Sequence, residues 1–489
     1  MSRLVPPADS QVFRDDRPSA PGAAALWPVV ALAACYLVLL TALTWLMLGP
    51  PESFRGFARD TATAEAPRRV ALYADALHAS AAPLSERTYL WGVRATLVGL
   101  FLLHGAAVWR ASRSPAMGRG ERRLWYGLPI GAMTVALAYP PTSADLFYYA
   151  MAGHLVADRG VNPYLVTPAT FPTDPLVPLN YWTGITSPYG PLWTTISRGV
   201  VLLVGDDPLR VSLAFKALAA LAAIGLAVIV ARVTSDLWPG EGLAAYVLVG
   251  WHPILIVESA GTGHHDALIM LPAMVGLGLL GHERTRSAVL ALALSALMKP
   301  VTVPLLALAA LARLRERRWS GAIRGWAGDL LAVSLLVVVV SVPYWAGGAM
   351  LRSLLAEPGR LVSNPFYGLL ANLIGTLWGP GTRGRVALDA GPISKIVVAV
   401  IVVMLAGWSA SRLWRTRPRG WALVRAEATG WTAITIVLAL VPSSAHPWYA
   451  IWTLGPVALV TRSRGRALAA YLLLIGLFAL LYHTDVAGG

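Results

Sequence analysis

The 489-residue sequence has few charged residues and almost no cysteine. Charged residues make up 13% of the chain, against roughly 25% in a typical soluble domain. Hydrophobic residues make up 56%, and the mean hydropathy is +0.60. This balance excludes an ordinary soluble protein. The single cysteine, Cys35, excludes an intramolecular disulfide and gives no indication of the redox compartment.

Acidic residues are also scarce, because 25 Asp and Glu stand against 40 Lys and Arg and give a net charge of +15. In a soluble protein such a charge favours nucleic acid as a partner. Here the arginines gather in short segments between apolar runs, where positive charge sets membrane orientation and contacts anionic lipid. We therefore expect no nucleic-acid partner. The basic segments are 110–123, 281–286, 313–324, 411–420 and 462–466.

Long apolar runs are abundant, and they predict an all-α, polytopic membrane protein of about thirteen spans. The first run is too long for a cleavable signal peptide, and other runs follow it. With the basic segments on the cytoplasmic side of a plasma membrane, the N-terminus lies inside and the C-terminus outside. The predicted spans are about 27–48, 89–109, 124–141, 209–232, 243–257, 266–280, 287–298, 301–312, 326–345, 393–410, 428–442, 448–461 and 467–483.

The segments between these spans differ in length and character. Three long loops, 49–88, 142–208 and 346–392, face the outside, and the polar, proline-rich residues 1–26 form a disordered cytoplasmic tail. If residues 191–205 crossed the membrane, every later basic segment would move outside, so we expect an interfacial helix there with Trp193 as its anchor. Spans 287–298 and 301–312 are short, and we expect a hairpin that turns at Lys299 within the membrane.

This topology places several polar clusters on the outer face, where ionisable residues at the bilayer boundary are functional candidates. Asp145 emerges there at the outer end of the third span, in the stretch TSADLFYY. The other clusters are RGVNPY (159–164), TSPYGPLW (186–193), GTGHHD (261–266), MKP (298–300), SNPFYG (363–368) and SAHPWY (444–449).

Each cluster also has a purely structural explanation. Asp145 could cap the helix that follows it, and Asp266 could stabilise a helix N-terminus. The prolines could mark turns, and the Trp and Tyr residues could form an interfacial belt. Lys299 could extend to the surface or contact a buried anion. His264 and His265 point in different directions on a helix and have no third ligand nearby, so no metal site is predicted, although metal dependence stays open.

At these residues the sequence resembles the integral-membrane glycosyltransferases of the GT-C fold, through SADLFYY followed by RGVNPY and SPYGPLW. The segments WHPILIVESAGTGHHDALIM (251–270), SALMKPVTVPLL (295–306) and HPWYAIW (446–452) resemble the actinobacterial polyprenol-phosphomannose-dependent α-1,6-mannosyltransferases, which build the mannan core of lipomannan. The resemblance implies a GT-C transmembrane core at 124–489. It also makes residues 27–123 a two-span N-terminal addition to that core.

The resemblance implies a mannosyltransferase of the cell envelope. Its donor is expected to be polyprenyl-phosphate mannose and its acceptor a lipomannan-type α-1,6-mannan, with no cofactor. Asp145, which matches the family's aspartate in the first outer loop of the core, would be the general base of an inverting transfer. The residues expected on the donor phosphate are Lys299, Arg159, His265 and His446. Those expected on the sugars are Asn162, Tyr164, Tyr189, His264 and Asp266.

Three other functions stay open from the sequence. A flippase for a lipid-linked sugar would also have short helices and polar residues in the membrane, but no internal repeat is found. A GT-C transferase of another sugar, such as arabinofuranose, would differ only in pocket shape. A structural scaffold leaves the one-sided clustering unexplained. The family pattern GGHND reads GTGHHD here, which leaves the role of His265 open, and there is no DXD motif of the kind that binds a nucleotide sugar.

Overall fold

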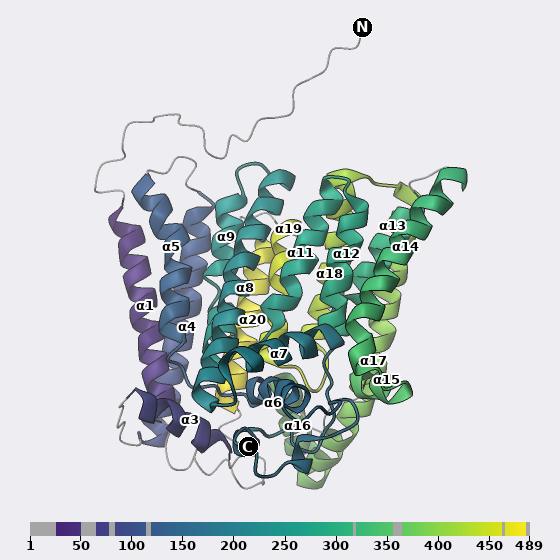
Figure 1. The fold of residues 1–489 in the computed structure, drawn as a ribbon. Coiled ribbons are helices and arrows are strands. Elements are labelled where there is room, and N and C mark those ends of the chain that lie inside the picture. The colour runs from purple at the N-terminus through teal and green to yellow at the C-terminus, as the bar shows by residue number, and fades with distance from the viewer. Residues whose placement is uncertain are drawn as a thin grey trace.

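The structure is a computed structural model that describes residues 26–49, 65–77, 84–113, 119–315, 319–355, 364–461 and 465–485. The predicted tail lies almost wholly outside these ranges, as do parts of the predicted outer loops and of the basic segments. In the described residues all regular secondary structure is helical (Figure 1), which confirms the all-α class.

Every predicted span coincides with a helix or a pair of helices. These helices are α1 (Trp27–Leu48), α4 (Glu86–Ala111), α5 (Arg119–Ala136), α8 (Pro208–Leu237), α9 (Gly242–Gly250) with α10 (Pro253–Ile256) and η5 (Val257–Gly261), α11 (Asp266–Gly281), α12 (Thr285–Met298), α13 (Val303–Arg315), α14 (Trp319–Ser341), α17 (Pro380–Thr416), α18 (Gly420–Leu440), α19 (Ile451–Val460) and α20 (Arg466–Asp485). The predicted loops contain α3 (Glu65–Ala76), α6 (Asp145–Ala157), η3 (Pro168–Thr170), η4 (Val177–Leu179), α7 (Pro191–Val204), α15 (Gly348–Leu355) and α16 (Pro365–Trp378). Three short elements, η6 (Pro300–Thr302), η7 (Val342–Tyr344) and η8 (Pro447–Ala450), lie at the ends of predicted spans.

Six of the described helices are long and apolar enough to cross a membrane. They lie in α1, α4, α8, α14, α17 and α18. A seventh span results if α9 and the α10–η5 segment count as one broken span. The two parts are bent by 55° at a break before Pro253, which has no N–H to continue the helix. The other helices at predicted spans are shorter or more polar, so the number thirteen and the GT-C type stay predictions.

Helix α7 runs across the bundle rather than along it, near the end where α3, α6 and α16 also lie (lower part of Figure 1). It packs against α6, α8 and α12. This is the orientation predicted for a helix at the membrane surface. The long polar loops and their short helices therefore gather at one end of the bundle.

The helices of 27–123 share one hydrophobic core with the rest of the bundle. Tyr36 of α1 donates through its hydroxyl to the carbonyl of Trp251 at 2.7 Å, and Trp251 Nε1 donates to the carbonyl of Trp125 at 3.0 Å. All three rings are buried. The packing thus ties α1 and α5 to the bend between α9 and α10, and this bend leads directly to η5 and the GTGHHD segment.

Lys216 of α8 is fully buried and holds the chain between α5 and α6. Its ammonium donates to the carbonyl oxygens of Leu137 at 2.7 Å and Tyr139 at 2.6 Å, and to the Tyr73 hydroxyl at 3.0 Å. Carbonyl groups at a helix C-terminus have no partner within the helix, and the two prolines that follow bring no N–H. Lys216 therefore fixes the segment that leads to Asp145.

Replacing Lys216 by Met is expected to lower the free energy of unfolding by about 2–4 kcal/mol, because each buried acceptor left unpaired costs about 1–3 kcal/mol. Thermal unfolding followed by circular dichroism in detergent measures this loss. Arg210→Ala is the matched control on the same helix, since Arg210 is exposed and forms a surface ion pair with Asp207 at 3.6 Å. It should change stability by less than about 1 kcal/mol. Equal losses in the two variants would contradict the anchoring role.

Candidate active site

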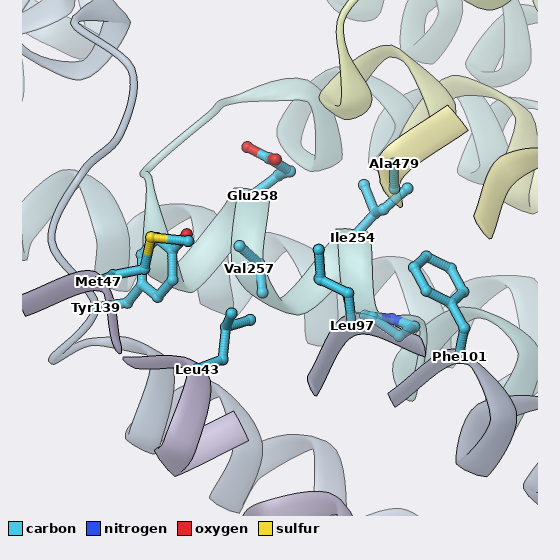
Figure 2. Close-up of a pocket in the computed structure, with 10 residues that line it drawn as sticks. Leu43, Met47, Leu97, Phe101, Tyr139, Ile254, Val257, Glu258 and Ala479 are labelled. Carbon is cyan, nitrogen blue, oxygen red and sulfur yellow. The ribbon is translucent and has the colours of Figure 1, made fainter. Parts of the chain in front are cut away.

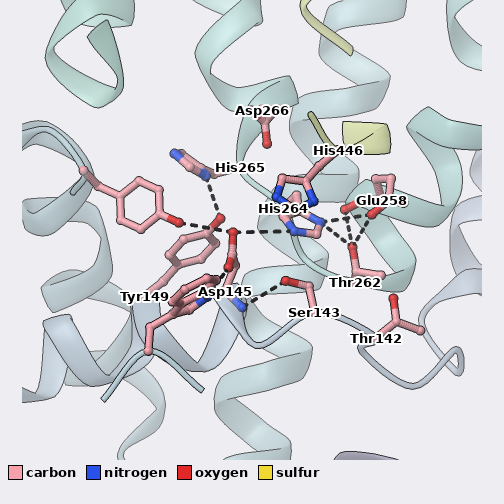
Figure 3. A network of polar contacts seen from close by, with 12 residues as sticks. Thr142, Ser143, Asp145, Tyr149, Glu258, Thr262, His264, His265, Asp266 and His446 are labelled. Carbon is pink, nitrogen blue, oxygen red and sulfur yellow. Dashed lines mark hydrogen bonds and ion pairs between the residues drawn. The ribbon is translucent and has the colours of Figure 1, made fainter. Parts of the chain in front are cut away.

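The carboxylate of Asp145 is held by side chains from three other parts of the chain (Figure 3). Trp182 Nε1 donates to Oδ1 at 2.8 Å, and the Tyr189 hydroxyl donates to Oδ2 at 3.2 Å. His264 Nε2 lies 3.8 Å from the same Oδ2. The Asp145 side chain is 13% exposed. A carboxylate has about four lone-pair positions, so these partners leave acceptor capacity for a ligand on the open side.

The contacts of Asp145 differ from those of a helix cap. It is the first residue of α6 rather than its N-cap, which is Ala144. Its own N–H donates to Ser143 Oγ at 3.2 Å, and its carboxylate bonds to side chains 37 and 44 residues further along the chain. Asp145 retains the favourable position of an acid in the first turn of a helix, but its side chain is directed to a site shared by several segments.

Glu258, Thr262 and His264 meet in the turn between η5 and α11 (Figure 3). The turn is closed by a backbone bond from His264 N to Glu258 O at 2.8 Å. Gly263 has a φ of +78°, a left-handed value that favours glycine. Within the turn, His264 Nδ1 lies 2.6 Å from Thr262 Oγ1 and 3.1 Å from Glu258 Oε2. The turn thus places a carboxylate–imidazole pair beside Asp145.

Two of the predicted histidines stack on one tryptophan. The Trp448 ring lies 3.9 Å from that of His264, at 17° between the planes, and 4.3 Å from that of His446, at 4°. His446 Nδ1 also lies 2.8 Å from the hydroxyl of Tyr482 in α20. The segment before α19 is therefore joined to the GTGHHD turn by ring stacking, and His446 belongs to the same cluster as Asp145.

Lys299 and Asp266 form a second charged pair where α11 begins and α12 ends. Lys299 Nζ lies 3.3 Å from Asp266 Oδ1, and Trp452 Nε1 donates to the same oxygen at 2.6 Å. The ammonium also lies 4.9 Å from the ring centroids of both Tyr449 and Trp452. The Lys299 side chain is 18% exposed, whereas Asp266 is buried. An ammonium has three donors, so Lys299 can also bind an anion from its open side.

His265 lies in an aromatic enclosure. Its ring stacks on Trp193 at 4.4 Å and makes edge contacts with Tyr149 at 4.8 Å and Tyr189 at 5.0 Å, and its Nδ1 lies 3.0 Å from the Tyr149 hydroxyl. Trp193 itself is only 3% exposed. The prediction of Trp193 as a lipid-facing anchor is therefore wrong, because its ring packs inward on His265 and Tyr149.

Asn162 and Tyr164 lie beyond the other end of α6, whose 13 residues extend over about 20 Å. Asn162 Nδ2 donates to the carbonyl of Tyr344 at 2.9 Å, and the Tyr164 hydroxyl donates to the carbonyl of Tyr189 at 2.7 Å. These bonds tie the loop after α6 to η7 and to the segment before α7. Tyr164 thus supports the loop that carries Tyr189, and Asn162 holds η7, so these two bonds go to backbone carbonyls rather than to Asp145.

Arg159 belongs to an ion-pair network at the far end of α6. His154 is buried there, with Nδ1 at 2.6 Å from Asp174 Oδ2 and Nε2 at 2.8 Å from Asp158 Oδ2. Arg159 lies 3.7 Å from the same Asp174 oxygen, and its side chain is 42% exposed. The hydrogen bond to Asp174 raises the pKa of His154 above its ordinary value of 6.5. This network connects α6 to the segment between η3 and η4, away from the Asp145 cluster.

The His154 contacts predict a pH-dependent attachment of that segment. Because the pKa of His154 is raised in the folded protein, the charged contacts stabilise fully below the unfolded value of about 6.5. The stabilisation is lost as the pH rises through the raised folded value. The protection factors of the amides within 171–176, which are corrected for the intrinsic rise of exchange with pH, should therefore be higher at low pH and fall above this range. His154→Gln is expected to remove the step, and a step that persists in this variant would contradict the assignment.

Several residues of the cluster were not predicted from the sequence. Trp182 stands in no recognised motif. Thr262 and Trp452 lie inside the quoted segments GTGHHD and HPWYAIW, but neither was singled out as a site residue, and Glu258 lies three residues before GTGHHD. Trp182 and Trp452 reach the site through chain folding rather than through local spacing. In the described ranges, no group of three or more His, Cys, Asp or Glu side chains has an arrangement that could hold a metal ion.

A narrow, largely apolar pocket has Glu258 among its lining residues (Figure 2). Its walls come from α1, α4, α10, η5 and α20, including Leu43, Leu97, Phe101 and Ala479. Glu258 therefore lines this pocket and also contacts the His264 ring.

The fold and the site define a polytopic membrane protein whose ionisable and aromatic side chains gather at one end of the helix bundle. Residues 57–315, more than half of the chain, match the family model described as "Alpha-(1->6)-mannopyranosyltransferase, N-terminal domain", and the chain belongs to this family. The family predicted from the motifs is thereby confirmed.

Curated relatives carry the same name. The chain is 26% identical over 344 residues to alpha-(1→6)-mannopyranosyltransferase A of Mycobacterium tuberculosis, covering 68% of this chain and 64% of the relative. It is 27% identical over 226 residues to the enzyme of that name from Corynebacterium glutamicum, covering 44% of each. A probable alpha-(1→6)-mannopyranosyltransferase of Mycolicibacterium smegmatis is 26% identical over 447 residues, covering 79% of this chain and 75% of the relative. The chain thus spans less than two thirds of the first two relatives. No solved structure matches this chain.

Proposed function

We propose that this protein is a membrane glycosyltransferase that moves mannose from polyprenyl-phosphate mannose to a lipomannan-type α-1,6-mannan, with inversion at the anomeric carbon. Family membership and the names of the relatives support the class of reaction. The observation that carries the proposal is the partly exposed carboxylate of Asp145, which is oriented by Trp182 and Tyr189.

Asp145 is the general base in this proposal. It takes the proton of the acceptor 6-hydroxyl while that oxygen attacks the anomeric carbon from the face opposite the phosphate. A positioned base contributes roughly 10²–10⁴-fold to the rate. Two hydrogen bonds hold the carboxylate in one orientation, and such positioning is what an in-line attack requires.

Lys299 stabilises the leaving phosphate. The departing polyprenyl phosphate is an anion and needs no acid, but it needs a cation where its charge develops. Lys299 lies beside Tyr449 and Trp452, with part of its side chain open. His446 is a second donor on this side of the cluster, whereas Arg159 and His265 have no assigned role because of the contacts described above.

The sugars bind among the aromatic rings around these two charges. Tyr189 and Trp182 are partly exposed, and the buried Trp448 stacks on the partly exposed His446. Aromatic faces suit the apolar faces of hexose rings, and the polar edges of His264, Asp266 and Tyr189 supply hydrogen bonds. The proposed reaction needs no cofactor, and its metal dependence stays open.

The site faces the outside of the plasma membrane in this proposal, and the N-terminus is cytoplasmic. The basic segments between helices support this orientation through the positive-inside rule. The polyprenyl tail of the donor then lies in the bilayer, and the mannan acceptor approaches from the outer surface. The orientation can be tested independently of activity by placing single cysteines in the loops of a Cys35→Ala protein and labelling intact cells with a membrane-impermeant thiol reagent. Cysteines in outer loops should be labelled, and those in the basic segments should not.

Incubation of the purified protein in nanodiscs with labelled polyprenyl-phosphate mannose and a synthetic α-1,6-mannoside tests the function. Linkage analysis of the product should find a new α-1,6-mannose. Movement of the intact lipid across vesicle membranes without transfer would identify a flippase instead. Transfer from polyprenyl-phosphate arabinofuranose in place of mannose would overturn the sugar assignment.

A further inference from the structure

His264 lies between two carboxylates of different segments. Its Nε2 faces Asp145 Oδ2 at 3.8 Å, and its Nδ1 faces Glu258 Oε2 at 3.1 Å. Thr262 Oγ1 lies 3.0 Å from the same Glu258 oxygen and 2.6 Å from His264 Nδ1. Stacking on Trp448 fixes the plane of the imidazole. The order carboxylate–imidazole–carboxylate is therefore fixed by the fold (Figure 3).

The burial of these groups makes their charges interdependent. The side chain of His264 is fully buried and that of Glu258 is 2% exposed, and Glu258 lines a largely apolar pocket (Figure 2). In such surroundings opposite charges attract more strongly than in water, and two carboxylates close together need a cation between them. Burial alone lowers the pKa of His264, but the hydrogen bond to Glu258 and the charge of Asp145 outweigh it and raise this pKa.

Other ionisable groups near this imidazole and its two carboxylates are Asp266 at the start of α11, the adjacent His265, His446 before η8, and the phenols of Tyr139 and Tyr482. The carboxylate of Asp266 favours the charged form of His264, whereas His446 disfavours that form only when His446 is itself protonated. The ammonium of Lys299 disfavours the protonation of His446, and it is paired with Asp266. The balance of nearby charge therefore favours a protonated His264.

We propose that Glu258 and His264 are positioning residues for Asp145: Glu258 keeps His264 protonated, and the imidazolium keeps Asp145 an unprotonated carboxylate until the acceptor binds. This inference rests on the proposed function. In the transfer, the acceptor O–H bond breaks and its proton goes to Asp145. The hydroxyl oxygen bonds to the anomeric carbon, and the bond from that carbon to the phosphate oxygen breaks, its electron pair leaving on the polyprenyl phosphate. Glu258 stays negative and His264 stays positive throughout, so this pair has no net charge. When Asp145 takes the proton and becomes neutral, none of these three groups is left with an unpaired charge.

The first test is the pH dependence of transfer. His264→Gln keeps a polar side chain but cannot be a cation, so the acid limb of the kcat profile should move to higher pH. The value of kcat near neutral pH should fall by roughly tenfold or more, with KM changed less than about twofold. His104→Gln is the matched control, because His104 is another buried histidine, which contacts the carbonyl of Leu248 at 3.1 Å in the helix core. Its profile should keep the acid limb of the unaltered protein.

The second test does not depend on activity. Nitrogen NMR of histidine-labelled protein reports the protonation of each imidazole, and His264→Gln assigns the His264 signals. We expect His264 to be doubly protonated near neutral pH and to become neutral in Glu258→Gln. A neutral His264 in the unaltered protein would overturn the inference, whatever the reaction is.

The two tests separate the inference from the proposed function. If the protein transfers mannose and Asp145→Asn abolishes transfer, an unchanged acid limb in His264→Gln overturns the positioning role alone. If the protein transfers no sugar, the proposed function fails, and the NMR result still decides whether Glu258 holds His264 as a cation beside Asp145.

Discussion

Asp145→Asn is expected to lower kcat for mannosyl transfer by about 10²–10⁴-fold, because the amide cannot accept the proton of the acceptor hydroxyl. The amide is close in shape to the carboxylate, and its oxygen can still accept the bond from Trp182 Nε1. The structure of the site should therefore persist. Initial rates with labelled donor and a saturating synthetic mannoside measure the loss.

Asp158→Asn is the matched control for this substitution. Asp158 lies just after the other end of the same helix, where its side chain is 49% exposed and contacts His154. Its replacement should change the rate less than about twofold, since the rate is governed by the group at the reacting atoms. Donor binding by Asp145→Asn, measured by the quenching of tryptophan fluorescence, should remain. Undiminished transfer by a folded Asp145→Asn protein would end the assignment of this residue as the base.

Lys299→Gln is expected to lower kcat by about 10²–10³-fold, because the developing phosphate charge loses its cation. The same change leaves the buried carboxylate of Asp266 with Trp452 but without its ion-pair partner, so it should also lower the melting temperature. The two effects have different origins, and a second variant separates them.

The double variant Lys299→Gln, Asp266→Asn removes both charges of the pair. Its melting temperature should recover toward that of the unaltered protein, because no unpaired charge stays buried. Its kcat should stay low, because the cation is still missing. Recovery of activity together with stability would mean that Lys299 only holds Asp266 and does not act on the donor.

The sequence predicts the positions of the helices well, and the fold brings several of the residues that it singles out close together. The apolar runs predict where each helix lies, because an apolar segment is stabilised both by contact with lipid and by burial in the helix bundle. The turn at Lys299 is confirmed between α12 and η6. Asp145, His264, Asp266, Lys299 and His446 are brought to one end of the bundle, as expected from the side assigned to their loops.

The contacts within that site could not be predicted from spacing. Arg159 stands only 14 positions after Asp145, yet α6 is a straight helix and carries it about 20 Å away. Trp182 bonds to Asp145 from an irregular loop with no periodic pattern. The role of Glu258 depends on the π-type turn η5, a form that local sequence does not specify.

Gly190 joins the two charged parts of the site through the backbone. Its N–H donates to the carbonyl of Met298 at 2.8 Å, and a Cβ atom at this position would stand 2.0 Å from the carbonyl oxygen of Leu297. Gly190 directly follows Tyr189, which bonds to Asp145, and Met298 directly precedes Lys299. The spacing between the base and the cation is thus set by main-chain contact rather than by rotamer choice. A movement of the segment that carries Lys299 would therefore be transmitted through this backbone contact to the segment that carries Tyr189, without a separate moving lid.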